Sequence, residues 1–522
     1  MLAPPKHASA FSSSPIRYRG HSIPEGSGAV KTAENAGHAD RPGVCPVCAR
    51  SAREDCPYSF RRLARAGIIA PFGAADAMEQ PAPARNEPKA VFGWCMYDWA
   101  NSAYATTVLT GLLPFYFRKA VVGAEGISIG GSHYSATSLW GFAGVAATLL
   151  AFLTAPVLGA IADFSAAKKR FLLTFAYTGS LFTILLWFCQ SGDVARTMVF
   201  FVIAQFGFVG ANVFYDAFLP QIVSEDRLDR VSGRGYAYGY LGGGLQFAIA
   251  LGLVAGHDRL GLSEAGAVRI ALVMAGVWWA GFTLFTACLL RETGPAGMLL
   301  PQRYRPRPRP VAYVAVGVAR TLKTARRVGR FRHLLLFLIA FMLYNDGIQT
   351  VITMATMYGA DELGLSAAVL MVTLLVIQAV AMIGALLFSR IADGLGTKRT
   401  VMLTLALWSG VVVYAYFIQG ATEFFVLGGI VGLVLGGSQA LSRSFYGSII
   451  PTDASAEFFG FYTVFAKFSA IWGPLAFAVI RQLTGSARAS IVSLIVFFLT
   501  GLVLLHFVDE NKAREAKHAW IA

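Results

Sequence analysis

The chain has 522 residues, of which 56% are hydrophobic and only 14% are charged, and its mean hydropathy is +0.57. A soluble globular protein usually carries about 25% charged residues, so this charge content is too low to cover a soluble surface of this size, whereas lipid can replace water over it. The net charge of +15 does not indicate nucleic-acid binding, because Lys and Arg form short clusters between long apolar runs, as in the loops of membrane proteins.

Residues 1–90 differ in composition from the rest of the chain. They are rich in Ala, Pro, Gly, Ser and Arg and contain no apolar run long enough to span a bilayer, so we expect a disordered tail without a signal peptide. Translation from Met78 is an alternative start that would make the preceding residues an artefact of gene prediction. Cys45 and Cys48 have half the spacing of a zinc site, but a second pair is missing, so no metal site is predicted.

Twelve apolar runs follow the tail. Each has about 20 residues or more, which is enough to cross about 30 Å of hydrocarbon as a helix, and none shows the alternation of barrel strands. The runs are 91–117, 136–162, 170–190, 196–222, 234–256, 267–290, 333–358, 367–389, 400–419, 424–450, 458–480 and 489–508. We therefore predict an all-α membrane protein with twelve transmembrane helices.

The distribution of basic residues predicts the orientation in the membrane. If the first span enters from the cytoplasm, and basic residues at the ends of spans are counted with the adjoining connection, the cytoplasmic connections and the C-terminal segment hold 23 Lys and Arg, and the opposite side holds 7. Because cytoplasmic loops carry the excess of Lys and Arg, both termini are expected in the cytoplasm, with the protein in the inner (cytoplasmic) membrane.

The longest connection, 291–332, divides the spans into halves of six, 91–290 and 333–508, and 509–522 follows as a cytoplasmic tail. The first part of the connection is too rich in proline to be a helix interior. From Val311 to Arg332 basic residues alternate with apolar ones, which is typical of a helix on an anionic leaflet. A nucleic-acid or regulatory role for this basic stretch is the alternative.

The two halves repeat each other. Three segments recur in the same order, which indicates a duplicated six-helix unit. The pairs are 159–163 with 389–393, 210–216 with 437–443, and the segments that start at Tyr97 and Tyr344, at offsets of 230, 227 and 247 residues. Repeats of this kind place the substrate site between the halves, near the middle of the bilayer.

Two of these segments carry a family resemblance. Gly159 to Asp163 with the basic cluster after it, and the repeat that ends at Asp393, resemble the signature of the major facilitator superfamily. Phe164 and Ala166 depart from that signature, where a basic residue and a glycine are usual.

Further segments resemble the vacuole-effluxer family within that superfamily, the branch with autophagy-related fungal vacuolar amino-acid exporters and many bacterial members. They are Tyr97-Asp98-Trp99-Ala100-Asn101-Ser102-Ala103-Tyr104, Ser232-Gly233-Arg234-Gly235, Tyr344-Asn345-Asp346-Gly347-Ile348-Gln349-Thr350 and Gln439-Ala440-Leu441-Ser442-Arg443-Ser444. The resemblance covers about 91–508 and implies the major facilitator fold, with two pseudo-symmetric halves, and a transporter role. For a bacterial member it implies little about the substrate.

Few ionisable residues lie within the predicted spans: Asp98, Asp216, Asp346, Arg443 and Lys467. A charge at the bilayer centre costs at least about 2.5–3.5 kcal/mol on insertion scales. Each of these groups is therefore expected to face a partner or a water-filled cavity, and to have a function.

Asp98 and Asp346 occupy matching places in the first span of each half, which lines the central cavity in the facilitator fold, as do the fourth and tenth spans. A carboxylate there can bind a substrate amine or carry a proton; the alternative is a packing role, in which the Asp caps backbone or meets a Tyr or Asn of a neighbouring helix. Polar side chains near these two Asp residues can supply hydrogen bonds. They either surround a solute or join helices, and they are Tyr97, Asn101, Tyr344, Asn345 and Gln349.

Lys467 is the most isolated charge, midway along the eleventh span. It either neutralises Asp346 within its own half or binds a substrate carboxylate. Since an amino-acid-like solute requires charges of both signs, the set of span residues is compatible with such a solute.

Candidate gating residues lie near the cytoplasmic ends of the spans. Asp216 and Arg443 are related by the pseudo-twofold axis and either meet across the cavity as a gate or form salt bridges within their own halves. The family resemblance implies gating by Asp163 and Asp393 with their basic clusters; positive-inside topology alone is the alternative. The clusters are Lys168, Lys169, Arg170, Lys398 and Arg399.

The sequence favours a secondary transporter of a small polar solute, with amino acids and export as the specific expectation. No nucleotide-binding loop or soluble domain is recognisable, and the eight histidines lie in the tail, loops or span ends, so neither an enzyme nor a cofactor or metal is predicted. A solute or proton gradient then drives transport. The expected partners are the solute, protons and membrane lipids, with a monomeric chain. The alternative is a membrane receptor or scaffold that senses a ligand without transporting it.

Overall fold

The computed structural model describes residues 85–521, except residues 124, 293–297 and 330. The described residues belong to a unit that starts at Ala74. The expectations for the tail up to residue 84, including the start at Met78 and the pair of cysteines, lie outside them. The first helix of the described residues begins at Pro88, slightly before the predicted boundary.

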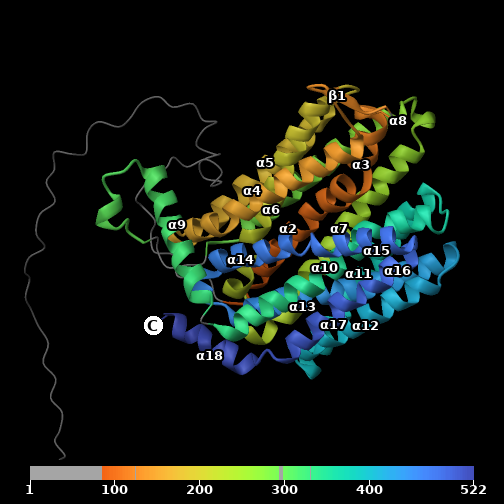
Figure 1. The fold of residues 1–522 in the computed structure, drawn as a ribbon. Coiled ribbons are helices and arrows are strands. Elements are labelled where there is room, and N and C mark those ends of the chain that lie inside the picture. Colours follow the sequence, from red (N-terminus) through yellow and green to blue (C-terminus); the bar gives the residue numbers. More distant parts are fainter. Residues whose placement is uncertain (1–84, 124, 293–297, 330, 522) are drawn as a thin grey trace, which may run out of the picture. The chain divides into compact units, whose positions relative to one another are not determined.

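The first half of the described chain is almost entirely helical (Figure 1). Its helices are α2 Pro88–Ala103, η1 Tyr104–Leu112, α3 Leu113–Tyr116, η2 Phe117–Val122, α4 Ala136–Ser165, α5 Lys168–Leu185, η3 Leu186–Phe188, α6 Val194–Ile222, η4 Glu225–Arg227, α7 Leu228–Ala255, η5 Asp258–Leu260 and α8 Glu264–Leu289. A short antiparallel hairpin of β1 Ile127–Ile129 and β2 Ser132–Tyr134 precedes α4.

The linker and second half are also helical. Their elements are η6 Gln302–Tyr304, α9 Arg309–Val328, α10 Arg332–Asp361, α11 Ala367–Leu395, α12 Thr397–Phe417, α13 Ala421–Ile449, η7 Thr452–Ala454, α14 Ser455–Phe468, α15 Trp472–Thr484, α16 Ala487–Ser493, α17 Ile495–His506 and α18 Glu510–Ile521. Helix α9 matches the helix expected in the linker, and the segment expected as a tail forms α18.

The helices of the described residues confirm the predicted spans, eleven of them by long apolar helical segments and the first by a helix of mixed α and π geometry. Eleven helical segments of the described chain are long and apolar enough to cross a membrane. The first span is a continuous helix from Pro88 to Val122, in which α-helical turns alternate with two π-helical stretches, η1 and η2. The eleventh span is interrupted between Phe468 and Trp472, where α14 ends and α15 begins. Neither irregularity was expected from the sequence.

Close backbone contacts hold the helices of each half together. A Cβ atom at Gly384 of α11 would lie 2.0 Å from the Leu433 carbonyl oxygen, and one at Gly436 of α13 would lie 2.1 Å from the Ala381 carbonyl oxygen. Only glycine permits this approach of α11 to α13. In lipid, where packing rather than hydrophobicity drives helix association, such contacts are the main source of cohesion.

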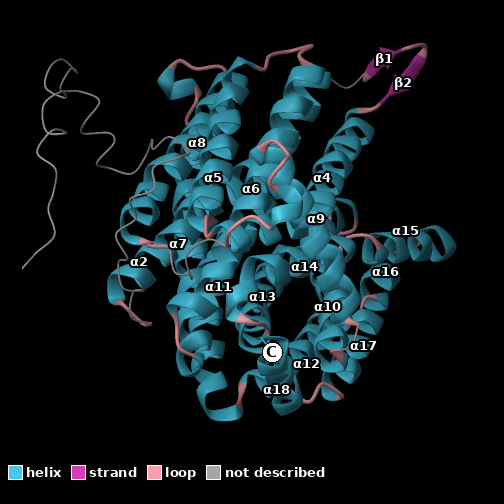
Figure 2. Ribbon diagram, turned by 90° about the vertical axis from the view of Figure 1, so that its left-hand side faces the viewer, coloured by secondary structure: helices cyan, strands magenta, loops and turns pink. Residues whose placement is uncertain are grey.

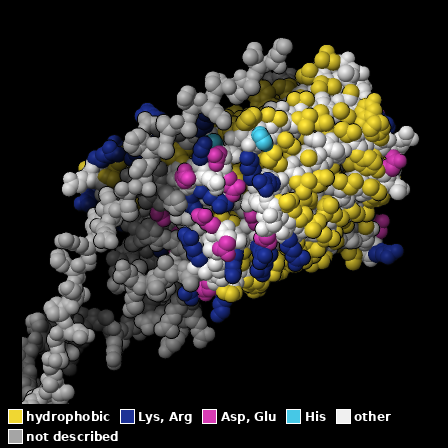
Figure 3. Space-filling model, turned by 90° about the horizontal axis from the view of Figure 1, so that it is seen from below, with side chains coloured by type: hydrophobic (Ala, Val, Ile, Leu, Met, Phe, Trp, Pro, Cys, Tyr) yellow, Lys and Arg dark blue, Asp and Glu magenta, His cyan; other side chains and the backbone are white. Residues whose placement is uncertain are grey.

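Both the beginning of α2 and the end of α17 lie on one side of the spans, which we call the terminal side. The hairpin β1–β2 lies at the other end of the helices from α18 (Figure 2). Charged side chains gather at one end of the surface in Figure 3, and hydrophobic ones cover most of the remainder. This distribution is typical of a surface with a lipid-facing band.

The turn after α4 contains a strained residue. Ala166 has φ 50° and ψ 46°, the left-handed conformation, and its N–H bonds the Ala162 carbonyl oxygen. In the second half Gly396 takes the corresponding position with φ 84°. A left-handed conformation costs an L-residue other than glycine about 1–2 kcal/mol, so the replacement of the usual glycine by Ala166 stores strain here.

We expect Ala166→Gly to stabilise the protein by about 1 kcal/mol, because glycine adopts φ above zero without a clash. The measurement is the midpoint of thermal unfolding in detergent. Ala167→Gly is the matched control: Ala167 has φ −125°, so glycine relieves nothing there and should not raise the midpoint. A lower midpoint for Ala166→Gly than for the unaltered chain would contradict the assignment of strain.

Candidate functional site

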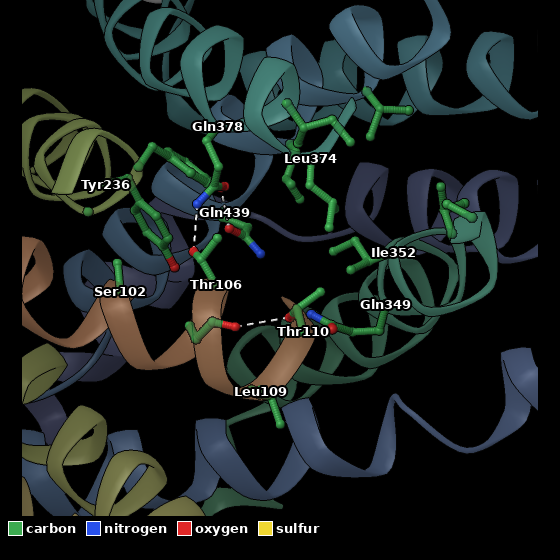
Figure 4. A pocket seen from close by; sticks show the side chains of 18 of the residues that line it. Ser102, Thr106, Leu109, Thr110, Tyr236, Gln349, Ile352, Leu374, Gln378 and Gln439 are labelled. Carbon is green, nitrogen blue, oxygen red and sulfur yellow. Dashed lines mark hydrogen bonds between the residues drawn. The ribbon is translucent and has the colours of Figure 1, made fainter. Parts of the chain in front are cut away.

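A cavity of about 440 Å³ lies between the two halves. As expected, residues of the first, fourth, seventh and tenth spans line it, and the fifth, eighth, ninth, eleventh and twelfth spans contribute as well. The π-helical stretch η1 provides Thr106, Leu109 and Thr110 to the lining. Thr110 lies beside Gln349 of α10, and Thr106 accepts a hydrogen bond from Gln378 of α11 at 2.6 Å (Figure 4). Because π-helical turns are frequent at functional sites, this stretch agrees with the position of the cavity.

The two walls of the cavity differ in chemistry. The first half contributes mainly polar groups, which include Asn101, Ser102, Thr106, Gln205 and Asn212. The second half contributes mainly apolar ones, which include Ile352, Leu374, Ile377, Val411 and Leu427. A solute in this cavity therefore meets hydrogen-bonding groups on one side and hydrocarbon on the other.

Arg443 of α13 carries a guanidinium group at the inner end of the cavity, where it is only 2% exposed. Its Nη1 lies 3.2 Å from Asp216 Oδ1 and 3.6 Å from Asp98 Oδ2. The Tyr215 hydroxyl donates to the same Asp98 oxygen at 3.0 Å. The predicted meeting of Asp216 and Arg443 across the halves is therefore present, and Asp98 joins them.

Neighbouring groups enclose the guanidinium further. Arg443 Nε donates to Ser232 Oγ at 3.0 Å, and Nη2 donates to the Ser232 carbonyl oxygen at 2.9 Å. The guanidinium carbon lies 4.1 Å from the ring centre of Tyr236 and 4.8 Å from that of Trp94. Hydrogen bonds and cation–π contacts together offset the desolvation of a charge this deeply buried.

The charges of the cavity lining are two carboxylates, Asp98 and Asp216, and two cations, Arg443 and Lys467. Two carboxylates share one guanidinium, so the cluster carries one excess negative charge when both are ionised. Lys467 forms no ion pair with any acidic group that the structure describes. The lining thus presents one negative charge in excess at the Asp98–Asp216 cluster and one positive charge, that of Lys467, without an ion pair among the described residues.

The pairing of Lys467 with Asp346, one of the two alternatives for Lys467, is absent. Asp346 Oδ2 accepts the Trp472 N–H at 3.1 Å and Oδ1 accepts the Gly473 N–H at 2.9 Å. These amides begin α15 and have no partner within their own helix. The break in the eleventh span therefore directs the Asp346 carboxylate to a helix end, which is the packing alternative considered for it.

The other predicted substrate residues differ in which cavity they line. Asn101 lines the main cavity, Tyr344 and Asn345 line a second cavity of about 270 Å³, and Gln349 lines both. The second cavity shares Lys467 with the main one. Tyr97 and Asp346 line neither cavity.

Asp163 joins the two halves on the terminal side. Its Oδ2 accepts the Glu457 N–H at 2.8 Å and its Oδ1 accepts the Ala456 N–H at 3.3 Å, so an acid of α4 caps the first turn of α14. Lys168 lies 2.7 Å from the same carboxylate. The close approach requires Gly159, where a Cβ atom would lie 2.2 Å from the Ala456 carbonyl oxygen.

The second copy of this segment also contacts the opposite half. Asp393 Oδ2 lies 2.8 Å from Arg230 Nε of α7, and Asp229 accepts a hydrogen bond from Thr397 at 2.7 Å. Gln221 further donates to the Thr452 carbonyl oxygen at 3.0 Å. Contacts of both copies therefore close the terminal side, while the cavity extends from Arg443 towards the opposite side.

The rest of the basic clusters does not join the halves. The Lys169 amide bonds Glu292, and the Lys398 ammonium donates to the carbonyl oxygens of His506 and Val508 in its own half. Arg170 and Arg399 are exposed, and within the described residues neither has an ion pair. Lys168 alone among the described residues of these clusters contacts the opposite half, since its Nζ donates to Ser455 Oγ at the start of α14 at 3.3 Å.

Glu292, which follows α8, was not predicted as part of this region. Its two carboxylate oxygens accept the amides of Lys168 and Lys169 and so cap α5. Burial raises the pKa of this carboxyl, although the amide of Lys169 and the charge of Lys168 act in the opposite direction. The sequence does not indicate this contact, because Glu292 lies far from α5 in the chain.

Sequence reasoning also missed Tyr215, Ser232, Tyr236 and Gln439. Tyr240 donates to Gln439 Oε1 at 2.7 Å, a further contact between the halves. Ser232 and Gln439 belong to the segments that carry the family resemblance, which was a signal for them. The tyrosines gave none, since aromatic residues are frequent throughout the spans.

The sequence is similar to a family of membrane transporters. A profile of the family described as Vacuole effluxer Atg22 like matches residues 86–518. The MFS-type transporter YxiO of Bacillus subtilis is 35% identical over 425 residues, which are 81% of this chain and 95% of that protein. Autophagy-related protein 22 of Coccidioides immitis is 25% identical over 554 residues, covering 82% of this chain and 88% of that protein.

Solved structures with the same fold are transporters of the major facilitator superfamily. The human organic anion transporter MFSD10 superimposes with a TM-score of 0.58 at 17% identity, over 82% of this chain and all of that one. FucP, solved in the outward conformation, gives a TM-score of 0.59 at 11% identity, over 81% of this chain and 99% of that one. At these identities the likeness concerns the fold.

We expect Arg443→Met to lower the free energy of unfolding by about 3 kcal/mol or more, because removal of one partner leaves buried carboxylates uncompensated. The measurement is unfolding by a denaturing detergent in mixed micelles. Arg481→Met is the matched control: Arg481 lies 3.3 Å from Asp361, both partly exposed, and such a pair contributes at most about 1 kcal/mol. Equal losses in the two variants would contradict the role of Arg443.

Proposed function

Since the chain belongs to the Atg22-like vacuole effluxer family of the major facilitator superfamily, we propose that it moves a small polar solute across the cytoplasmic membrane by alternating access. The single observation that carries this mechanism is the cavity between the halves, closed at the terminal side by bonds from one half to the other. A transporter of this type exposes its site to one side at a time, and the bonds that close one side have to break when it opens.

The cross-half contacts specify which bonds would break. The Asp163 cap on α14 and the Asp393–Arg230 pair lie at the terminal side. The Arg443–Asp216 pair lies deeper, at the inner end of the cavity. Separation of the halves at the terminal side would remove the partners of all these groups together, and water would then replace them.

The excess of Lys and Arg on the terminal side supports a cytoplasmic location for both termini. With this orientation the cavity extends towards the outside, and the described conformation corresponds to an outward-facing state. Export, which the family description suggests, would require a state open to the cytoplasm to load the solute, followed by closure into the described conformation for release.

The charges of the cavity lining support a zwitterionic solute such as an amino acid. The excess carboxylate of the Asp98–Asp216 cluster suits an ammonium group, and Lys467 suits a carboxylate. The apolar wall of the second half suits a hydrocarbon side chain. Binding of an ammonium group to Asp216 would compete with Arg443 and weaken a bond between the halves, which would connect occupancy of the site to its opening.

Protons are the proposed coupling ion. Asp98 and Asp216 are within reach of the cavity, and a proton on either would leave a single carboxylate paired with Arg443. A receptor or scaffold that only senses the solute would use the same cavity without net flux. Measurement of flux therefore separates the two functions.

Asp98→Asn is expected to lower kcat/KM for transport at least about tenfold, because loss of a charge-assisted contact costs about 1.5–3 kcal/mol. The measurement is uptake of labelled amino acids, tested one by one, into proteoliposomes with an imposed pH gradient. Asp361→Asn is the matched control, since Asp361 forms an exposed pair outside the cavity. Normal transport by Asp98→Asn would remove this carboxylate from the mechanism, and no flux of any amino acid would reject the substrate class.

For Asp346 we expect an effect on stability rather than on solute recognition. Asp346→Ala removes the cap of α15 and should lower the free energy of unfolding by about 1–2 kcal/mol, with KM unchanged in the folded fraction. Asp346→Asn keeps one acceptor oxygen and should lose less. A raised KM for Asp346→Asn without loss of stability would restore the substrate-binding role.

A further inference from the structure

Helix α9, in the linker between the halves, packs along the terminal end of α4. A Cβ atom at Gly317 would lie 2.6 Å from the Ile161 Cγ1 atom and 3.0 Å from the Val157 carbonyl oxygen, so the two helices are in backbone contact. Figure 1 shows α9 crossing the ends of the spans beside α4 and α14. Since Val157 and Ile161 belong to a membrane span, α9 lies at the boundary between the hydrocarbon and the headgroups.

The same helix reaches the other half through Glu457 of α14. Arg320 Nε lies 3.8 Å from Glu457 Oε2, and Glu457 is only 1% exposed. Its second carboxylate oxygen has no hydrogen-bond partner in the part of the chain that the structure describes. The Glu457 amide is also the one that donates to Asp163. Glu457 therefore takes part in two contacts: its amide bonds Asp163 of α4, and its carboxylate pairs with Arg320 of α9.

The outer face of α9 has a different chemistry. Val311, Val314, Val318 and Leu322 form an exposed apolar stripe at helical spacing. Lys323, Arg326 and Arg327 border its end and line a groove together with Leu322. An uncovered apolar stripe beside a basic cluster is complementary to a phospholipid, whose acyl chain covers the stripe and whose phosphate meets the cations. Nucleic acid offers no such apolar partner.

We propose that α9 binds anionic phospholipid of the adjacent leaflet through this face and thereby latches the terminal side closed through Arg320 and Glu457. Lipid holds α9 at the membrane boundary, where it packs on α4 of one half and pairs with α14 of the other. Opening of the terminal side then has to break the Arg320–Glu457 pair or detach α9 from the lipid. Anionic lipid therefore favours the closed terminal side, which on the proposed alternating-access cycle is the outward-facing state.

Hydrogen exchange of the first turn of α14 tests the latch, because the amides of Ala456 and Glu457 are protected by Asp163 only while the terminal side is closed. The full chain is placed in nanodiscs of phosphatidylcholine alone or of phosphatidylcholine with phosphatidylglycerol. We expect about tenfold slower exchange of this turn with phosphatidylglycerol, since each basic residue near an anionic surface shifts the equilibrium severalfold. Inorganic phosphate added to phosphatidylcholine nanodiscs should have no effect.

Three variants locate the effect. Replacement of Lys323, Arg326 and Arg327 by Gln should abolish the difference between the two lipid compositions. Replacement of Arg303, Arg305 and Arg307 by Gln removes the same charge from the exposed segment before α9 and should leave the difference intact. Arg320→Gln should retain protection of α9 by anionic lipid but lose the slowing at α14.

Equal exchange of the unaltered chain in the two lipids would overturn the proposal without any variant. An undiminished lipid effect after loss of the three α9 cations would also overturn it, as would an equal loss in the control triple variant or slowing by inorganic phosphate. The proposal rests on the alternating-access function, but the exchange experiment needs no substrate. Failure of transport and failure of the latch are therefore observed separately.

Discussion

The buried guanidinium of Arg443 is the constraint on which the site depends. A cation this deep requires counter-charges and hydrogen bonds, since its desolvation is otherwise prohibitive. Asp216 and Asp98 of the first half meet this requirement, with Ser232 supplying two further acceptors. Because donor and acceptors come from different halves, the electrostatics of one residue link the two copies at the inner end of the cavity. The same linkage makes the site sensitive to a solute that brings its own charge.

Carboxylates that cap helix ends form the second recurring device. Asp163 caps α14 from the other half, Asp346 caps α15 after the break in the eleventh span, and Glu292 caps α5 from the linker side. Amides at a helix start have no partner in their own helix, and for α15, which begins inside the eleventh span, the bilayer offers no water in their place. Only the Asp163 cap joins the halves, so it closes the terminal side, while the other two stabilise their own halves.

The fold could be predicted from the sequence almost completely. Run length and hydropathy located all twelve spans, and the repeats gave the two halves, because helix length in a bilayer is set by hydrocarbon thickness. The site could be predicted only in part. Asp98, Asp216 and Arg443 were recognised because charges in spans are rare, whereas Tyr215 and Glu292 were missed, since their importance comes from contacts with residues distant in the chain. Asp346 was assigned to the same class as Asp98 on symmetry, but its carboxylate caps α15.

By itself, then, the sequence determined the membrane class, the number of spans, the duplication and the set of residues that carry charge within the membrane, because each of these is a property of local composition. Tertiary structure alone decided how those charges are paired. It placed Arg443 against Asp98 and Asp216, left Lys467 without an acidic partner among the described residues and directed Asp346 to a helix end. The physical reason is that the energy of a charge pair depends on distances of a few ångströms between helices. The two halves share a sequence pattern, but in the second half the eleventh span is interrupted between α14 and α15, so equivalent residues have different neighbours.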